Sequence, residues 1–244
     1  MSDFNTKQKQ YWERRHLSAR RSPFHPAVKA YVDPKVEEIR SRIEINPGSR
    51  LLDVGCGNGF FLSAFDRICR VTGIDRSPVM LQMNPVTNTQ VMDAGRLEFP
   101  DRSFDITFCH ALLHHVADPG KVLGEMARVS SRYVVVLEPN RNHPLMFLFA
   151  LLVKEERAAL KFSARFLKKL AQAHELKIID IFAYGAIVPN KTPVFILPLL
   201  RLFNRRWPMG VTLFLIAEKH GNPTEDIHED PDALHRPGLT DLPA

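Results

Sequence analysis

Three glycines alternate with other residues at the end of an apolar run. The run starts at Leu51, and the glycines are Gly55, Gly57 and Gly59. Alternating glycines let a loop turn sharply and let a ligand approach bare backbone, because a Cβ atom there would collide with the turn or with the ligand. Position 60 is Phe60, so the loop lacks the GxGxxG spacing of a dinucleotide fingerprint. We therefore expect a loop that binds a different ligand.

Three aspartates lie close to the ends of predicted strands. Asp53 precedes the first glycine by two residues, where its charge disfavours a pyrophosphate and suits a ligand with an ammonium group. Asp75 can accept both hydroxyls of a ribose, and Asp93 can accept from an adenine amino group. S-adenosylmethionine (AdoMet) combines an ammonium group and a sulfonium with ribose and adenine. The carboxylates therefore favour AdoMet as the cofactor.

Three histidines and one glutamate could act on the molecule that accepts the methyl group of AdoMet, as a base or by binding it. Because the methyl group of AdoMet is already activated, alignment of the reactants can supply roughly 7–11 kcal/mol in favourable cases. A general base becomes useful when the acceptor is a hydroxyl or an acidic carbon. His110, His114 and His115 are candidates for that base, since a histidine can be neutral and basic near pH 7. Glu138 is a candidate for gripping the acceptor; packing and loop anchoring are the alternative roles of these side chains.

A metal site and a cysteine nucleophile are not expected. No carboxylate lies at ligand spacing from the three histidines, and neighbouring residues such as His114 and His115 usually point apart. Cys56 lies inside the glycine loop, but no base is placed beside it in the sequence. Its small apolar side chain explains its place there.

Strand and helix patterns alternate around these residues. Predicted strands cover residues 50–54, 70–74, 90–92, 104–109, 133–137, 176–184 and 211–217, and predicted helical segments cover 78–83, 120–129 and 143–170, the last as two amphipathic helices. This alternation predicts a Rossmann-like α/β fold, in which a seven-stranded, mostly parallel sheet is flanked by helices. The binding crevice then lies at the carboxyl ends of the strands.

The chain divides into a helical lead-in, one domain and a tail. Residues 1–45 are expected to be helical, with a turn near Pro26 and with Pro34 in a first helical turn. Residues 46–220 form the cofactor domain, in which 141–209 is an insertion on the acceptor side. Residues 221–244 are rich in proline and acidic residues and are expected to be a disordered tail.

Several motifs in order resemble those of one enzyme family. The loop from Asp53 to Gly59, then Asp75, Asp93 and the segments 104–106 and 110–116 are similar to the successive motifs of class I AdoMet-dependent methyltransferases. The resemblance is to the small-molecule branch that includes ubiquinone and menaquinone biosynthesis methyltransferases, and it covers residues 45–140. The segment 11–13, Tyr-Trp-Glu, also resembles the aromatic entry segment of that branch.

This resemblance implies a role for each matching residue. The methionine part of AdoMet would be held by Asp53, Gly55, Cys56 and Gly57, and the ribose by Asp75. The adenine would lie beside Arg76 and Met80, with its edge at Asp93 and Ala94. The methyl-transfer side would be lined by His110 and Leu112. The alternative is that Asp53 and the glycines only shape a tight turn between a strand and a helix.

Composition limits the class of protein and its expected location in the cell. The 244 residues are 45% hydrophobic and 25% charged, as in a soluble globular protein. The three cysteines have no CxxC spacing and no apolar signal segment precedes them, which indicates a cytoplasmic protein. No run reaches the ~18 apolar residues that a membrane span needs.

The region 141–209 suggests the acceptor. It combines large aliphatic and aromatic side chains with many of the basic residues behind the net charge of +6. This combination favours a hydrophobic or lipid-linked small-molecule acceptor and a peripheral contact with the anionic inner face of a membrane. The alternatives are that the region only packs on the sheet, that the partner is RNA, or that the chain is a non-catalytic AdoMet-fold binding protein. A nicotinamide oxidoreductase is disfavoured by the glycine spacing.

Overall fold

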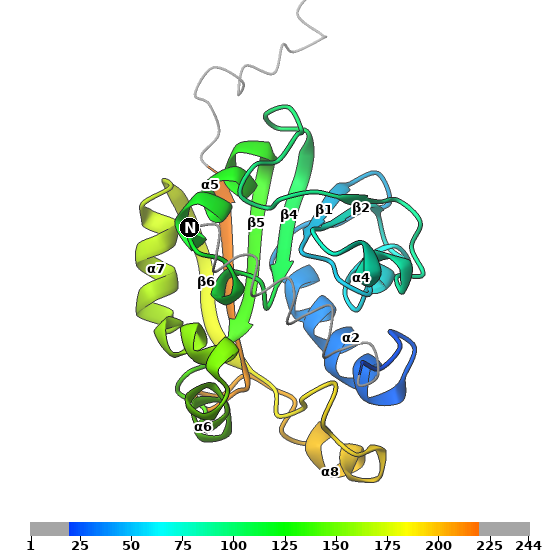
Figure 1. The fold of residues 1–244 in the computed structure, drawn as a ribbon, viewed down its shortest axis with the longest axis vertical. Coiled ribbons are helices and arrows are strands. Elements are labelled where there is room, and N and C mark those ends of the chain that lie inside the picture. The colour runs from blue at the N-terminus through cyan, green and yellow to red at the C-terminus, as the bar shows by residue number, and fades with distance from the viewer. Residues whose placement is uncertain (1–19, 220–244) are drawn as a thin grey trace, which may run out of the picture.

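The computed structural model describes residues 20–219, and within them seven strands form one sheet (Figure 1). They are β1 (Arg50–Val54), β2 (Arg70–Asp75), β3 (Thr89–Val91), β4 (Phe104–His110), β5 (Ser130–Pro139), β6 (Leu176–Tyr184) and β7 (Thr212–Lys219). The strand order is β3-β2-β1-β4-β5-β7-β6, and only β7 runs antiparallel to its neighbours. The prediction of a seven-stranded, mostly parallel sheet is confirmed. The predicted acidic tail and the 11–13 segment lie outside the described residues.

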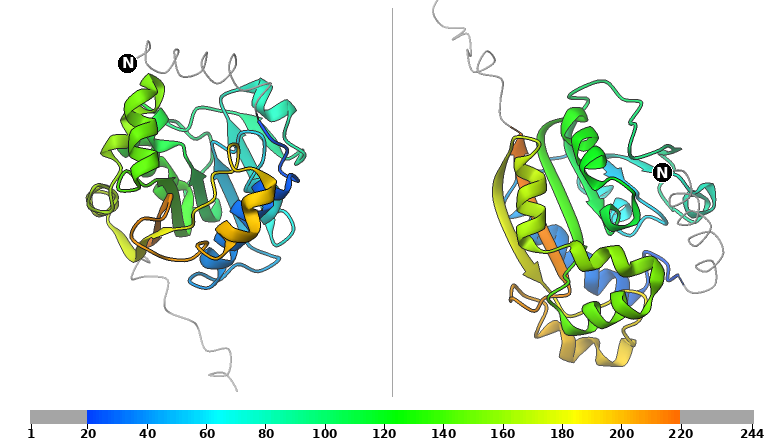
Figure 2. Two further views of the ribbon diagram at one scale, coloured as in Figure 1. Left: turned by 90° about the horizontal axis from the view of Figure 1, so that it is seen from below. Right: turned by 60° about the vertical axis from the view of Figure 1, so that its left-hand side comes forward.

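Helices cover both faces of the sheet (Figures 1 and 2). They are α2 (Pro26–Arg40), α3 (Leu62–Phe65), α4 (Pro78–Gln82), α5 (Pro119–Val129), α6 (Pro144–Leu152), α7 (Ala164–Gln172) and α8 (Leu197–Arg201), with the short 3-10 segments η1 (Leu113–His115), η2 (Lys154–Lys161) and η3 (Val194–Ile196). One apolar core joins α2 and α3 to the sheet through residues such as Ile39 and Phe65. A second core joins α5 and α7 to the other face through Leu123 and Leu167. The central strands are buried on both sides, as parallel strands in α/β proteins are.

The described part of the lead-in differs from its prediction in one respect. Helix α2 begins at Pro26, where the His25 side chain accepts a hydrogen bond from the amide of Ala27, and it runs through Pro34 instead of starting there. A proline inside a helix leaves the carbonyl four residues earlier without its usual partner. Here the Asn204 side chain donates to that carbonyl, on Ala30, at 3.2 Å. A contact distant in sequence therefore lets the helix continue.

The segment 143–170 also differs from its prediction. Two amphipathic helices were expected, but the structure has three pieces, α6, η2 and α7. Val153 and Phe162 adopt extended backbone angles at the two breaks, and Ser163 caps α7 by accepting from the amide of Phe166. The breaks turn η2 back toward the sheet, where its residues contact η1.

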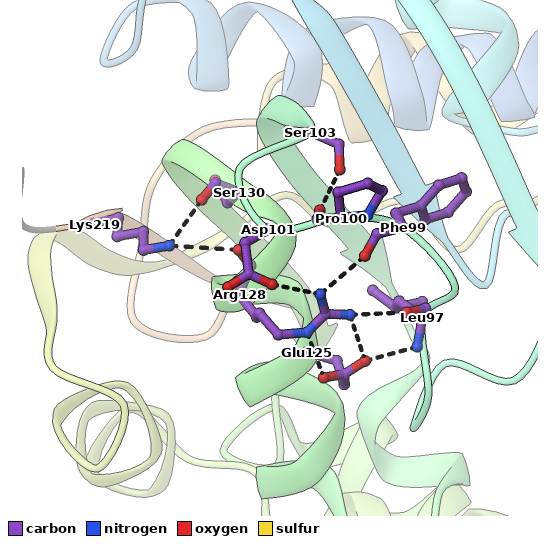
Figure 3. A network of polar contacts seen from close by, with 9 residues as sticks. All are labelled: Leu97, Phe99, Pro100, Asp101, Ser103, Glu125, Arg128, Ser130 and Lys219. Carbon is purple, nitrogen blue, oxygen red and sulfur yellow. Dashed lines mark hydrogen bonds and ion pairs between the residues drawn. The ribbon is translucent and has the colours of Figure 1, made fainter.

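A polar network closes the end of the sheet where β4 and β5 begin (Figure 3). Arg128 donates to both carboxylate oxygens of Glu125, to Asp101, and to the carbonyls of Leu97 and Phe99, at 2.7–2.9 Å. These five bonds use all five N–H donors of the guanidinium. The network ties the loop before β4 to the end of α5.

Candidate active site

A cavity of about 930 Å³ lies at the carboxyl ends of the parallel strands. All of the predicted cofactor residues and all three histidines line it: Asp53, Gly55, Cys56, Gly57, Asp75, Arg76, Met80, Asp93, Ala94, His110, Leu112, His114 and His115. Glu138 is the one candidate that does not line the cavity. The carboxyl ends of parallel strands meet at one edge of a sheet, which explains why these separate motifs come together.

The glycine loop depends on backbone that other residues rarely adopt. Gly55 and Gly57 have φ angles of +77° and +52°. A Cβ on Gly55 would lie 2.8 Å from the side chain of Leu112, and one on Gly57 would lie 3.3 Å from Met80 and point among the cavity residues. The amides of Gly55 and Cys56 both bond to the carbonyl of Ile74, so the loop is fixed to the end of β2. The result is a rigid, side-chain-free cradle.

Two carboxylates stand beside this cradle, Asp53 buried and Asp75 half-buried. Asp75 accepts from the amide of Gly57 at 3.0 Å and from that of Ser77 at 2.8 Å. Burial raises the pKa of Asp75, and these bonds oppose the rise. Burial raises the pKa of Asp53 well above its usual range, and the nearby charge of Asp75 adds to this. Two carboxylates that repel each other in a buried space favour a cationic ligand between them.

Asp93 lies nearer the cavity rim. Its carboxylate accepts from the amide of Gly95 at 2.7 Å, which orders the turn after β3. Met80 is buried and Ala94 half-buried near it on the cavity wall. This part of the cavity therefore offers one carboxylate between apolar side chains, which suits a flat ring with an amino group.

His110 is half-buried at the end of β4 and bonds to a tyrosine. Its Nε2 lies 2.8 Å from the Tyr31 hydroxyl, which is also 3.0 Å from Oγ1 of Thr212. Burial, together with the charges of Lys35, Arg20 and His114, lowers the pKa of His110 to about 3. Burial also raises the pKa of Tyr31 above its usual value. At neutral pH the pair is therefore an uncharged imidazole and an uncharged phenol.

The other two histidines meet a glutamate from a distant segment. Nε2 of His114 lies 3.3 Å from Oε2 of Glu156, and Nε2 of His115 lies 3.9 Å from the same oxygen. On its other side, Nδ1 of His114 lies 2.5 Å from Oε2 of Glu138. Burial lowers the pKa of His114, but the two glutamates outweigh it and raise the pKa to about 9. Two carboxylates thus converge on one buried imidazole.

Comparisons with known proteins point in the same direction as this geometry. Residues 52–133 match the family described as "Methyltransferase domain". A phosphatidylethanolamine N-methyltransferase from Cereibacter sphaeroides is 39% identical over 34% of this chain and 45% of its own length. A ubiquinone biosynthesis O-methyltransferase from Hahella chejuensis is 33% identical over 45% of this chain and 50% of its own length. The chain thus spans about half the length of these curated relatives.

A solved structure extends the likeness to the fold. The crystal structure of a SAM dependent methyltransferase from Aquifex aeolicus superposes with a TM-score of 0.56 at 16% identity, covering 88% of this chain and 98% of that one. Residues 52–133 match the methyltransferase domain family, and the chain shares its fold with this solved SAM dependent methyltransferase. The predicted resemblance to AdoMet-dependent methyltransferases, ubiquinone biosynthesis enzymes among them, is confirmed.

Glu138 has a different place in the structure from the one predicted. It was a candidate for gripping the acceptor, but its side chain is buried behind the cavity wall. It accepts from the amides of Leu112 and Leu113 at 3.0 and 2.7 Å and contacts His114. All of these contacts anchor the segment after β4, so the loop-anchor alternative fits its position.

Several polar residues that line the same cavity were not predicted from the sequence, and three of them contact predicted site residues or the glycine loop. These are Arg20, Tyr31 and Glu156. Arg20 donates to the side chain of Asn58 at 2.9 Å, next to the glycine loop. The helical pattern of the lead-in indicates that α2 has a buried face but not that Tyr31 reaches His110. Glu156 gives no sequence signal, because it lies in a charged stretch that is typical of a solvated helix.

Proposed function

We propose that this chain binds AdoMet and transfers its methyl group, by in-line displacement, to a small hydrophobic or lipid-linked acceptor. The observation that carries the proposal is the convergence of Asp53 and Asp75 with the side-chain-free loop in one cavity. Two carboxylates that repel each other, one buried and one half-buried, suit a cationic nucleoside. The similarity of residues 52–133 to methyltransferase domains supports the same function.

The residues fit AdoMet part by part. Asp53 and the backbone of Gly55 and Gly57 would hold the methionine part, with the guanidinium of Arg20 near its carboxylate. Asp75 has lone pairs beyond its two backbone bonds for the ribose hydroxyls. The adenine would lie among four residues of the cavity wall and rim: Arg76, Met80, Asp93 and Ala94.

At the methyl-transfer side, His110 and Leu112 would face the acceptor. AdoMet, when bound, would supply a methyl group activated on its sulfonium sulfur for in-line displacement by a lone pair of the acceptor. An imidazole with a pKa near 3 is unprotonated at neutral pH but is a weak base. We therefore assign His110, with Tyr31, to orienting the acceptor by hydrogen bonds, so that alignment provides most of the catalysis.

An apolar surface at the cavity end supports a lipid-like acceptor. Large exposed side chains gather on α6 and in the segment 194–209: Leu145, Phe147, Leu148, Phe149, Leu151, Leu152, Val194, Phe195, Leu199, Leu202, Phe203 and Met209. In Figures 1 and 2 α6 and α8 project from the same end of the molecule. Met146 and Phe149 of α6 also line the cavity. Exposed basic residues lie close to these side chains in the sequence, among them Lys154, Arg201 and Arg205, and basic residues beside an apolar surface suit a peripheral contact with an anionic membrane.

Calorimetry tests the cofactor. Wild-type protein should bind AdoMet and its demethylated product S-adenosylhomocysteine, and Asp75→Ala should weaken binding by roughly 10- to 100-fold, since a hydrogen bond to a charged group contributes about 1.5–3 kcal/mol. Gly57→Val should abolish binding by filling the cradle. Asp105→Ala is the matched control, because Asp105 pairs with Arg50 at the other end of the sheet. Unchanged affinity in folded Asp75→Ala would refute the ribose assignment.

Two further assays address the acceptor and its alternatives. Lipid and quinone extracts incubated with radiolabelled AdoMet should yield a labelled apolar product. Sedimentation with anionic vesicles should show association that falls with salt and in Phe195→Ser, whose side chain is 83% exposed in the wild type. Absence of association at low and high salt would remove the membrane proposal. Labelling of RNA instead of lipid would favour the nucleic-acid alternative.

Within residues 20–219 we find no helix with the length and apolar character needed to cross a bilayer. The membrane contact that we propose is made by the surface of α6 and the segment 194–209. We propose a cytoplasmic location, with this surface at the inner membrane face.

A further inference from the structure

Three possible metal ligands converge on one wall of the cavity. One ring nitrogen from each of His114 and His115 and a carboxylate oxygen of Glu156 all lie within 4.8 Å of one another. The ligands of a tetrahedral zinc ion, at metal distances of about 2.0–2.2 Å, lie roughly 3.3–3.5 Å apart. The distances of 3.3 and 3.9 Å from the histidines to Oε2 of Glu156 are close to that spacing. Small side-chain rotations would bring all three atoms to one ion.

We propose that His114, His115 and Glu156 form a binding site for one divalent transition-metal ion, with zinc the ion that this donor set fits best. Imidazole nitrogens and a carboxylate oxygen suit zinc and similar ions, whereas magnesium and calcium prefer oxygen ligands alone. The site is distinct from the residues assigned to AdoMet.

Both reasons for expecting no metal from the sequence are absent in the structure. The 3-10 segment η1 brings the rings of His114 and His115 together, with centroids 3.8 Å apart and ring planes tilted by 44°, so the two neighbours do not point away from each other. The missing carboxylate comes from η2, which the break at Val153 turns back toward η1. Neither feature can be recognised from residue spacing.

A supporting carboxylate is already in place behind one ligand. A histidine that binds a metal through one ring nitrogen usually donates its other N–H to a carboxylate or carbonyl, which fixes the tautomer and the ring orientation. Glu138 stands 2.5 Å from Nδ1 of His114 and is itself held by two backbone amides. This arrangement leaves Nε2 of His114 directed toward Glu156.

The site is sheltered but open on the cavity side. The side chains of His114, His115 and Glu156 are 1%, 8% and 12% exposed, and all three line the same cavity as the glycine loop. Three protein ligands leave a fourth position of the ion for another molecule, as in catalytic zinc sites. Resting on the proposed function, the ion would bind an oxygen of the acceptor, a hydroxyl or a phenol, and favour loss of its proton to water before methylation.

Metal content measured on the full chain tests the site. Protein stripped with a chelator is dialysed against zinc, and bound zinc is counted by mass spectrometry. We expect wild-type protein to bind one more zinc per chain than His115→Ala and Glu156→Gln. His174→Ala and Glu155→Gln are matched controls from outside the cluster and should bind as wild type does. Thermal unfolding of each variant checks that it is folded.

Cobalt substitution gives a readout on the wild-type protein, independent of variants. Cobalt bound by two imidazoles, a carboxylate and one water should show the intense visible absorption of a four-coordinate ion, whereas the hydrated ion absorbs weakly. Equal zinc content in wild-type, His115→Ala and Glu156→Gln protein, or a cobalt spectrum that stays that of the hydrated ion, would overturn the proposal.

The outcome is separable from that of the proposed function, because AdoMet binding is measured by calorimetry on the stripped protein. AdoMet binding without the additional zinc would sink the metal site and leave the methyltransferase proposal standing. Zinc binding without AdoMet binding would do the reverse.

Discussion

The two ends of strand β5 carry two polar clusters that differ in completeness. At its start, Arg128 spends all five N–H donors on Glu125, Asp101 and two carbonyls (Figure 3). At its end, Glu138 is saturated by two amides and His114, but His114 and Glu156 face the cavity with His115 beside them. The first cluster is closed, and the second has atoms directed toward a ligand.

The Arg128 cluster, whose donors are all used, is the more exposed of the two, and the cavity cluster is the more buried. The Arg128 side chain is 32% exposed, so water can replace part of what a substitution removes. The His114 and Glu138 side chains are 1% and 0% exposed, so water cannot. A buried group that loses its partner carries the full cost of desolvation. The closed network should therefore add a modest amount to the free energy of unfolding. The cavity cluster should add more, and it also leaves a coordination position open.

The largest effect is expected from Glu138→Ala. The change leaves the amides of Leu112 and Leu113 and the Nδ1 of His114 without their acceptor in a dry interior, which should lower the free energy of unfolding by roughly 3–5 kcal/mol. Urea denaturation measures this. Glu138→Gln keeps a carbonyl acceptor and should lose less. A loss of less than about 1 kcal/mol in Glu138→Ala, the size of one ordinary hydrogen bond, would show that the cluster is not a stability element.

Zinc should act at one end of β5 only. If the cavity cluster binds zinc, free zinc at roughly 100 times its dissociation constant should stabilise the wild type by about 2.7 kcal/mol. Arg128→Met should gain the same increment, since its change lies at the other end, and Glu156→Gln should gain none. Thermal unfolding with and without zinc checks this. An equal gain in Glu156→Gln would place the stabilising ion elsewhere.

Arg128→Met should have a smaller effect than Glu138→Ala. It removes five hydrogen bonds, but the freed carbonyls of Leu97 and Phe99 and the two carboxylates can reach water, so we expect a loss of roughly 2 kcal/mol. Arg128→Lys should recover little, because an ammonium cannot reproduce the planar fork. Affinity for AdoMet should not change in either variant. A loss larger than that of Glu138→Ala, by urea denaturation, would reverse the comparison.

The two clusters also differ in how much of them can be predicted from the sequence. Apolar runs such as 50–54 and 176–184 predict strands well, because burial on a sheet imposes a local pattern. The cofactor residues follow those strands directly, and the carboxyl ends of parallel strands share one edge. For that reason Asp53, Asp75 and Asp93 could be grouped at one cavity by their positions in the sequence alone.

Contacts made by long-range packing could not be predicted. Glu156 reaches the histidines only because the chain breaks at Val153 and forms η2, and helix α2 passes Pro34 only because Asn204 supplies a donor. Glu138 is of a residue type that could bind the methyl acceptor. Its anchoring role depends instead on where the amides of Leu112 and Leu113 lie. Local pattern gives the type of each side chain but not its partner.

The smallest predicted effect is the coupling between the two clusters. Arg128 lies in the last turn of α5, two residues before β5 begins, and the strand from Ser130 to Glu138, at about 3.3 Å per residue, separates the two clusters by on the order of 25 Å. When two substitutions lie this far apart and share no partner, their changes in the free energy of unfolding usually add to within ~0.5 kcal/mol. The double variant Arg128→Met with Glu138→Gln should therefore lose the sum of the two single losses, measured by urea denaturation. A coupling well above that value would mean that β5 transmits strain between its ends, and the closed network would then help to set the geometry of the cavity.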